Sequence, residues 1–144
     1  MDMIFSFFGA ILGCFLAHYL AYIRAHNERK CNLILQELNN FAGIIDETID
    51  ELNQHDGTTD FKKILLLRQR HINRKFEFVC KTLKKIKIDE SALKQRVDDL
   101  KERLSGEENS CIVTNNVGGQ DLQKIKALIF SSIDDIKWKI IERF

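Results

Sequence analysis

Side chains able to catalyse a reaction are few in this 144-residue chain, and their spacing does not bring them together. Cys80 and His71 are nine residues apart, so on one helix they point in opposite directions and cannot act as a nucleophile and its base. The adjacent acids Asp98 and Asp99 diverge by about 100° on a helix. No phosphate-binding loop, zinc-protease motif or nucleophile elbow occurs. The sequence therefore predicts a protein that is not an enzyme and binds no cofactor.

The cysteines do not form a metal-binding pattern. There are four of them, with no C-x-x-C pair and no pair of histidines at ligand spacing: Cys14, Cys31, Cys80 and Cys111. This spacing predicts no metal site, and it is typical of unpaired thiols in a reducing compartment.

The most distinctive spacing is a row of small residues near the N-terminus. Gly9, Gly13, Ala17 and Ala21 recur every four residues. In lipid, helices associate by close packing, and small residues let two backbones approach. We therefore expect this stripe to pack against a second copy of the chain or another membrane protein. His18 lies beside the stripe, either as a functional ionisable group within the membrane or as a side chain that reaches the inner headgroups.

The segment that carries the stripe is apolar and long. Residues 3–23 contain no charged side chain, and 21 residues make a helix of about 31 Å, close to the hydrocarbon thickness of a bilayer. The alternative, a cleaved signal peptide, lacks a positive charge before the apolar run. Arg24, Arg29 and Lys30 follow the segment, so the positive-inside rule places the N-terminus outside and the rest of the chain in the cytoplasm.

The remainder of the chain shows the three- and four-residue spacing of amphipathic helices, and proline is absent. The apolar face of the first helix, after Arg24, consists of Cys31, Ile34, Leu38, Phe41, Ile45, Thr48 and Leu52. A helix over 61–88 presents Leu65, Ile72, Phe76, Val79, Leu83 and Ile86. A shorter helix presents Leu93, Val97, Leu100 and Leu104. The last helix begins at Asp121 and presents Leu122, Ile125, Ile129, Ile133, Ile136, Ile140 and Phe144.

Turn signals separate these helices. Asp56 and Gly57 indicate a turn, and residues 105–120 have no helical period and contain three glycines. We expect a loop over 105–120, with a short strand or docked segment at 111–114. The acids at the end of the first helix are expected to face Lys62 and Lys63 across an antiparallel hairpin: Asp46, Glu47, Asp50 and Glu51.

Basic residues concentrate on the 61–88 helix, which carries ten of them against one acid. If this helix returns along the first one, its end approaches the inner headgroups. The residues expected to contact anionic lipid are Arg24, Lys81, Lys84, Lys85 and Lys87. A solvated face and nucleic-acid binding are the alternatives, and poor interleaving of aromatic residues makes nucleic acid an unlikely partner. Trp138 and Phe144 are expected to anchor the last helix at the membrane edge or to contact a partner.

These patterns predict an all-α fold in which a single transmembrane helix continues into a cytoplasmic antiparallel bundle, or coiled coil, of about four helices. The expected division is an anchor over 1–23, a hairpin plus a short helix over 24–104, a loop over 105–120 and an amphipathic helix over 121–144. The predicted function is a structural or adaptor role, in which the chain self-assembles or tethers a partner at the cytoplasmic face of the membrane. The alternative is an oligomeric pore-forming or depolarising effector that is triggered through the bundle.

Overall fold

The computed structural model describes the backbone of residues 2–54, 59–105 and 116–144, and the side chains of residues 10–52, 63–104 and 120–144. Within these residues the chain forms four helices and no strand. The helices are α1 (Asp2–Gln54), α2 (Thr59–Lys85), α3 (Ser91–Ser105) and α5 (Asn116–Arg143). The structure therefore confirms an all-α helical bundle.

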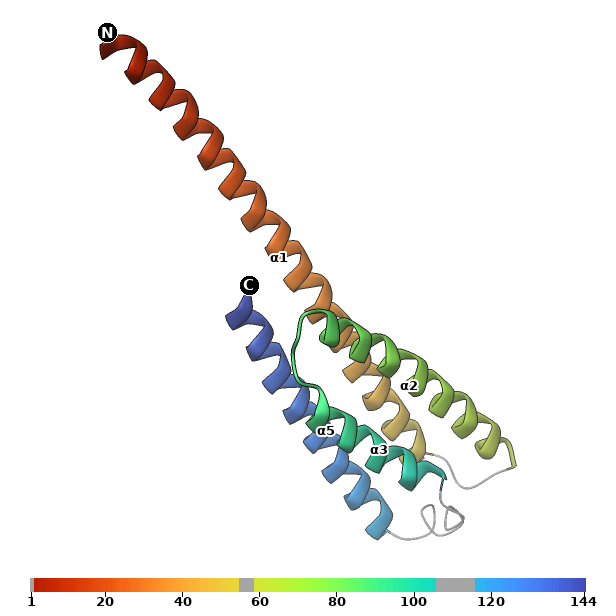
Figure 1. The fold of residues 1–144 in the computed structure, drawn as a ribbon. Helices are drawn as coiled ribbons and strands as arrows, with labels where there is room; N and C mark the ends of the chain where they lie inside the picture. The colour runs from red at the N-terminus through yellow and green to blue at the C-terminus, as the bar shows by residue number, and fades with distance from the viewer. Residues whose placement is uncertain (1, 55–58, 106–115) are drawn as a thin grey trace.

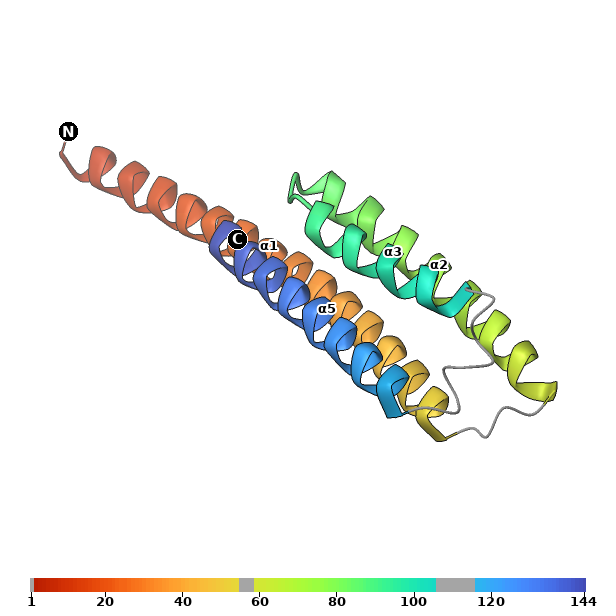
Figure 2. The ribbon, with the colours of Figure 1, turned by 90° about the horizontal axis from the view of Figure 1, so that it is seen from below.

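The four helices run up and down, and each packs antiparallel to its neighbours (Figure 1). α1 packs against α5 and α2, and α3 packs mainly against α5 and less closely against α2. The view from below shows α1 and α5 side by side (Figure 2). α1 is much longer than the bundle, so its N-terminal part extends beyond the other helices.

Most of the core consists of the apolar stripes that the sequence indicates. Ile49 and Ile88 are buried although they lie outside the predicted stripes, and Phe144, predicted on the stripe of the last helix, is exposed. Leu38, Phe41 and Ile45 of α1 are fully or almost fully buried, and the rings of Phe41 and Phe76 lie 5.7 Å apart between centroids. The α3 stripe, Leu93, Val97, Leu100 and Leu104, is wholly buried. Thr48 is the one buried polar residue among those described, and its hydroxyl donates to the Ile44 carbonyl at 2.7 Å. The buried face of α1 therefore accommodates Thr48 without leaving its hydroxyl unsatisfied.

Two clusters of ion pairs fix α1 against its neighbours. Arg68 of α2 binds Glu51, with Nε 2.8 Å from the carboxylate, and also Glu47. On the other side of α1, Lys126 of α5 binds Asp46 and Asp50. Of the four acids expected to face α2, Glu47 and Glu51 do so through Arg68, whereas Asp46 and Asp50 bind α5, which the prediction missed as the neighbour of this face of α1. The side chain of Lys62, one of the two expected partners, lies outside the described residues.

Helix limits differ from the prediction at both ends of α2, at the last residue of α3 and at the start of α5. α5 begins at Asn116, so residues 116–120 of the expected loop are helical, because the packing of the apolar stripe that follows overrides weak local propensity. α2 ends at Lys85 rather than at residue 88. The expected turn at Asp56 and Gly57 and the expected short strand at 111–114 lie outside the described residues.

The described part of the chain contains no helical stretch that meets both the length and the apolar character needed to span a membrane. The transmembrane part of the predicted fold is therefore not supported by the structure. Residues 3–9 of that predicted segment lie outside the described side chains. α1 itself is continuous from the apolar segment into the bundle.

Candidate functional site

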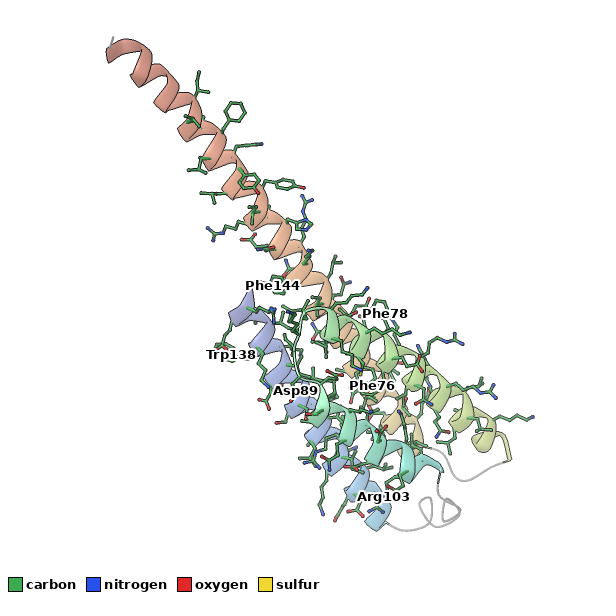
Figure 3. The ribbon with its side chains drawn as sticks, viewed as in Figure 1. Phe76, Phe78, Asp89, Arg103, Trp138 and Phe144 are labelled. Carbon is green, nitrogen blue, oxygen red and sulfur yellow. The ribbon has the colours of Figure 1, made fainter. Side chains whose placement is uncertain are left out.

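The feature that the bundle does not use is the part of α1 that projects from it, here called the apolar extension (residues 10–23). Its side chains pack against no other helix (Figure 3). Its large apolar residues are all exposed: Ile11, Leu12, Phe15, Leu16, Tyr19, Leu20, Tyr22 and Ile23. For Phe15 the exposed fraction reaches 72%. No charged residue lies in the extension, so it has no polar face to present to water.

The residues of the predicted small stripe lie on the other half of this helix. Large side chains occupy about 180° of its circumference, and Gly13, Ala17 and Ala21 share the rest with Ala10, Cys14 and His18. The three stripe residues are exposed, and a Cβ built on Gly13 would meet no heavy atom within 4 Å beyond its chain neighbours and the adjacent backbone of its own helix. His18 is exposed at the border between the two halves. The structure therefore leaves the stripe open, and Gly9 lies outside the described side chains.

The end of the bundle from which the extension emerges is here called the proximal end. It comprises residues 24–31 of α1, residues 81–90 at the end of α2 and its turn into α3, and residues 137–144 of α5 (Figure 1). Arg143 Nη1 donates to the Lys87 carbonyl at 3.4 Å, which ties α5 to the turn. Lys84 Nζ lies 3.6 Å from a Glu90 carboxylate oxygen. The site therefore brings together segments far apart in the sequence.

The turn between α2 and α3 is a compact helix cap. Ile88 N–H donates to the Leu83 carbonyl and Lys87 N–H to the Lys84 carbonyl, each at 3.0 Å, and both Ile88 and Leu83 are buried. These are the two hydrogen bonds and the apolar contact of a Schellman motif, which requires a left-handed residue between them. Lys87 takes that position with φ 52°. The motif fixes the direction in which α3 leaves the proximal end.

Asp89 completes the turn by capping α3. Its carboxylate accepts hydrogen bonds from the Ser91 N–H and the Ser91 hydroxyl, both at 3.0 Å. These two bonds, with a smaller contribution from Lys139, hold the pKa of Asp89 below its ordinary value. Figure 3 labels Asp89 where the chain enters α3 and Trp138 on α5.

The predicted lipid-contacting residues do not lie at one height. The contact of Lys75 with Glu37 and the ring pair Phe41–Phe76 set the register of α2 against α1. By this register Lys85 is about six residues past residue 23, roughly 9 Å along the helix, and Lys81 is roughly 15 Å past it. All four predicted lysines of α2 and its turn are exposed, as is Arg24, which pairs with Glu28 at 3.1 Å.

Trp138 and Phe144 also lie at different heights along α1. The pairing of Lys126 with Asp46 and Asp50 sets the register of α5 against α1. Phe144 lies near the level of residue 30, whereas Trp138 lies about 20 Å past residue 23. Trp138 points outward from α5 and is 63% exposed (Figure 3).

Sequence reasoning missed the polar residues that lock the bundle. Hydrogen bonding to Glu51 raises the pKa of Arg68, and hydrogen bonding to Asp46 raises the pKa of Lys126. Arg68 interrupts the apolar stripe of α2, which was the available signal for an interhelical ion pair. No such signal marks Lys126. Among the described residues, no group of three or more His, Cys, Asp or Glu is placed to hold a metal ion.

Comparison of the chain with known protein families, with curated proteins and with solved structures finds no match. The function proposed below therefore depends on the geometry of the proximal end and of the apolar extension.

Proposed function

We propose that the protein is a single-pass membrane protein whose bundle stands at the cytoplasmic face of the membrane and there holds a protein partner or a second copy of itself. In this proposal residues 3–23 lie in lipid, the N-terminus faces outside, and α1 carries the span directly into the bundle. The observation that carries the proposal is the exposure of the apolar extension.

Exposure of this segment to water is energetically unfavourable. Fully burying a Leu, Ile or Phe side chain contributes about 1.5–3 kcal/mol, and eight large apolar side chains of the extension are exposed. Their combined transfer free energy, on the order of 10 kcal/mol, is comparable to the whole stability of a typical domain. A cover of lipid or protein is therefore expected. The 21 uncharged residues over 3–23 match the length of a bilayer span, and the basic residues that follow favour a cytoplasmic bundle.

The tethering role is supported by apolar side chains on the outside of the bundle. Leu33, Phe78, Trp138 and Ile141 are each at least half exposed. Trp138 lies too far from the proposed span to reach the headgroups, so a protein contact is the better explanation for an exposed tryptophan there.

Membrane flotation tests the anchor. We expect the expressed full chain to float with membranes and to resist extraction at alkaline pH, and a Leu12→Lys/Leu16→Lys variant to lose both properties. Leu33→Lys is the matched control, because Leu33 is 62% exposed on the same helix, compared with 68% for Leu12 and 61% for Leu16, but lies in the bundle. Wild-type protein that remains in the supernatant would contradict the proposal.

Mass measurement of the detergent-extracted complex tests assembly. A mass above that of one chain plus its micelle, reduced by Gly13→Leu, supports packing through the small stripe. Gly13 is suitable because a Cβ there meets nothing within the chain, so the substitution does not disturb the fold. Loss of membrane potential on expression, abolished by Gly13→Leu, would instead favour the pore-forming effector. A monomer without a partner would contradict both functions.

A further inference from the structure

We propose that the proximal end of the bundle binds the anionic lipid headgroups of the cytoplasmic leaflet, so that the bundle is seated on the membrane as well as tethered to it. This inference rests on the proposed anchor and assigns a lipid partner to the bundle end.

Charge distinguishes the two ends of the bundle. The three segments of the proximal end, 24–31, 81–90 and 137–144, each carry a side-chain net charge of +2. In the last segment Lys137 and Lys139 lie near the height of Trp138, so Arg143 is its basic residue nearest the leaflet. At the opposite end, the corresponding segments 46–52, 63–70, 98–104 and 120–127 together carry −1. The chain as a whole has a net charge of only +1, so the basic character is concentrated where the extension emerges. A basic surface beside a membrane is attracted to anionic lipid.

The continuous helix α1 sets the distance between this surface and the leaflet. The polar headgroup layer adds about 5–7 Å to each side of the hydrocarbon core. The register of α2 places Lys85 roughly 9 Å past residue 23, and Lys87 follows in the turn. Both lysines therefore lie at the outer edge of the headgroups. Lys81 lies about 6 Å farther from the leaflet than Lys85, within one Debye length at physiological salt, and it contributes less.

Contacts within the bundle leave Lys85 and Lys87 available for this role. Within the described residues, the neighbouring acid Glu90 pairs with Lys84, and Asp89 is engaged by Ser91. Lys85 and Lys87 are exposed and take part in no ion pair with another described residue. Arg143 binds the Lys87 carbonyl rather than an acid, so its guanidinium adds positive charge at the same turn.

The full chain in lipid nanodiscs provides the test. We compare its thermal unfolding midpoint in discs of phosphatidylcholine alone and in discs that contain about one third phosphatidylserine. A ligand that binds only the folded state raises the midpoint, and each basic residue near the leaflet strengthens the binding about fivefold. We expect a midpoint about 4 °C higher in the anionic discs, and a difference that disappears in high salt.

Charge-reversal variants identify the residues that cause the difference in unfolding midpoint between the two kinds of disc. Lys85→Glu/Lys87→Glu should abolish the midpoint difference between the two kinds of disc. Arg70→Glu/Arg74→Glu is the matched control, because both arginines are exposed on α2 and make the same change in charge, but lie farther from the leaflet. This control should retain the difference. Comparing each variant with itself in two lipids removes any direct effect of the substitutions on folding.

The outcomes separate this inference from the proposed function. A wild-type chain that enters the discs but unfolds at the same temperature in both lipids overturns the seating of the bundle and leaves the anchor intact. Equal loss of the difference in the two charge-reversal variants also overturns it, because the effect would then come from total charge. A chain that does not enter the discs contradicts the anchor itself.

Discussion

Replacing Lys87 with glycine should stabilise the bundle, although glycine usually weakens a helical protein. Lys87 has φ 52° at the end of α2, in the left-handed region that residues with a Cβ rarely occupy. Glycine adopts this conformation without steric cost and is the common residue at this position of a Schellman motif. The exposed side chain of Lys87 makes no contact that the folded bundle needs, and its carbonyl would still accept from Arg143.

The expected gain in the free energy of unfolding is the difference between the relief of backbone strain and the extra loss of backbone entropy. A left-handed conformation costs an L-residue roughly 1–2 kcal/mol. Glycine loses more backbone entropy on folding, which offsets roughly 0.4–1 kcal/mol of that gain. The two hydrogen bonds of the cap, each 3.0 Å, are made by backbone atoms and stay in place. We expect a net stabilisation of about 0.5–1 kcal/mol.

Urea unfolding of the full chain in detergent, followed by far-ultraviolet circular dichroism, measures this change. Lys87→Ala removes the same charge and keeps a Cβ, so its stability should stay close to that of the wild type. Lys81→Gly introduces glycine into an exposed helical position and should cost about 1 kcal/mol. If Lys87→Gly is no more stable than Lys87→Ala, the left-handed conformation is not the source of strain and the reasoning fails.

Three further predictions concern the core and the ion pairs. Phe41→Ala should cost about 3–5 kcal/mol in urea unfolding because Phe41 is fully buried, whereas Phe78→Ala, at a side chain 50% exposed, should cost far less. The pKa of Lys126 is raised in the folded state, so its contribution to the stability of the bundle is complete below its unfolded pKa and is lost as pH rises through the folded pKa. Lys126→Met should abolish this loss of stability at alkaline pH. The pKa of Asp89 is lowered in the folded state, so its contribution to the stability of the bundle is present above its unfolded pKa and disappears as pH falls through the folded pKa. Asp89→Asn should flatten this part of the plot of stability against pH.

Each of these predictions has an outcome that would refute it. Equal losses for Phe41→Ala and Phe78→Ala would place Phe41 outside the core. Parallel pH profiles for the wild type and for Lys126→Met or Asp89→Asn would show that these groups do not change their protonation equilibrium on folding.

The helical faces could be predicted from the sequence because burial follows the spacing of apolar residues. Leu38, Phe41 and Ile45 are buried as their spacing indicates, and the α3 stripe is buried throughout. Spacing gives the face of each helix but does not name the neighbour that covers it. The partners of Asp46 and Asp50 were therefore assigned to α2, whereas α5 supplies Lys126.

Local backbone features could not be predicted from the sequence either. Lys87 occupies a position that glycine usually marks, so no turn signal identified the left-handed residue. The heights of Lys81 and Trp138 above the proposed membrane depend on interhelical register, which was available only from contacts such as Lys75–Glu37.

Because α1 is one uninterrupted helix, it transmits motion between its outer part and the bundle. Residues 2–54 form one helix, so a twist or an axial shift applied to its outer part is delivered to the bundle rather than absorbed at a joint. Each residue inserted between the two parts would turn them by about 100° and separate them by about 1.5 Å. One alanine added after Arg24 would misalign the bundle with the proposed span, whereas seven would return it almost to its original phase at a greater height.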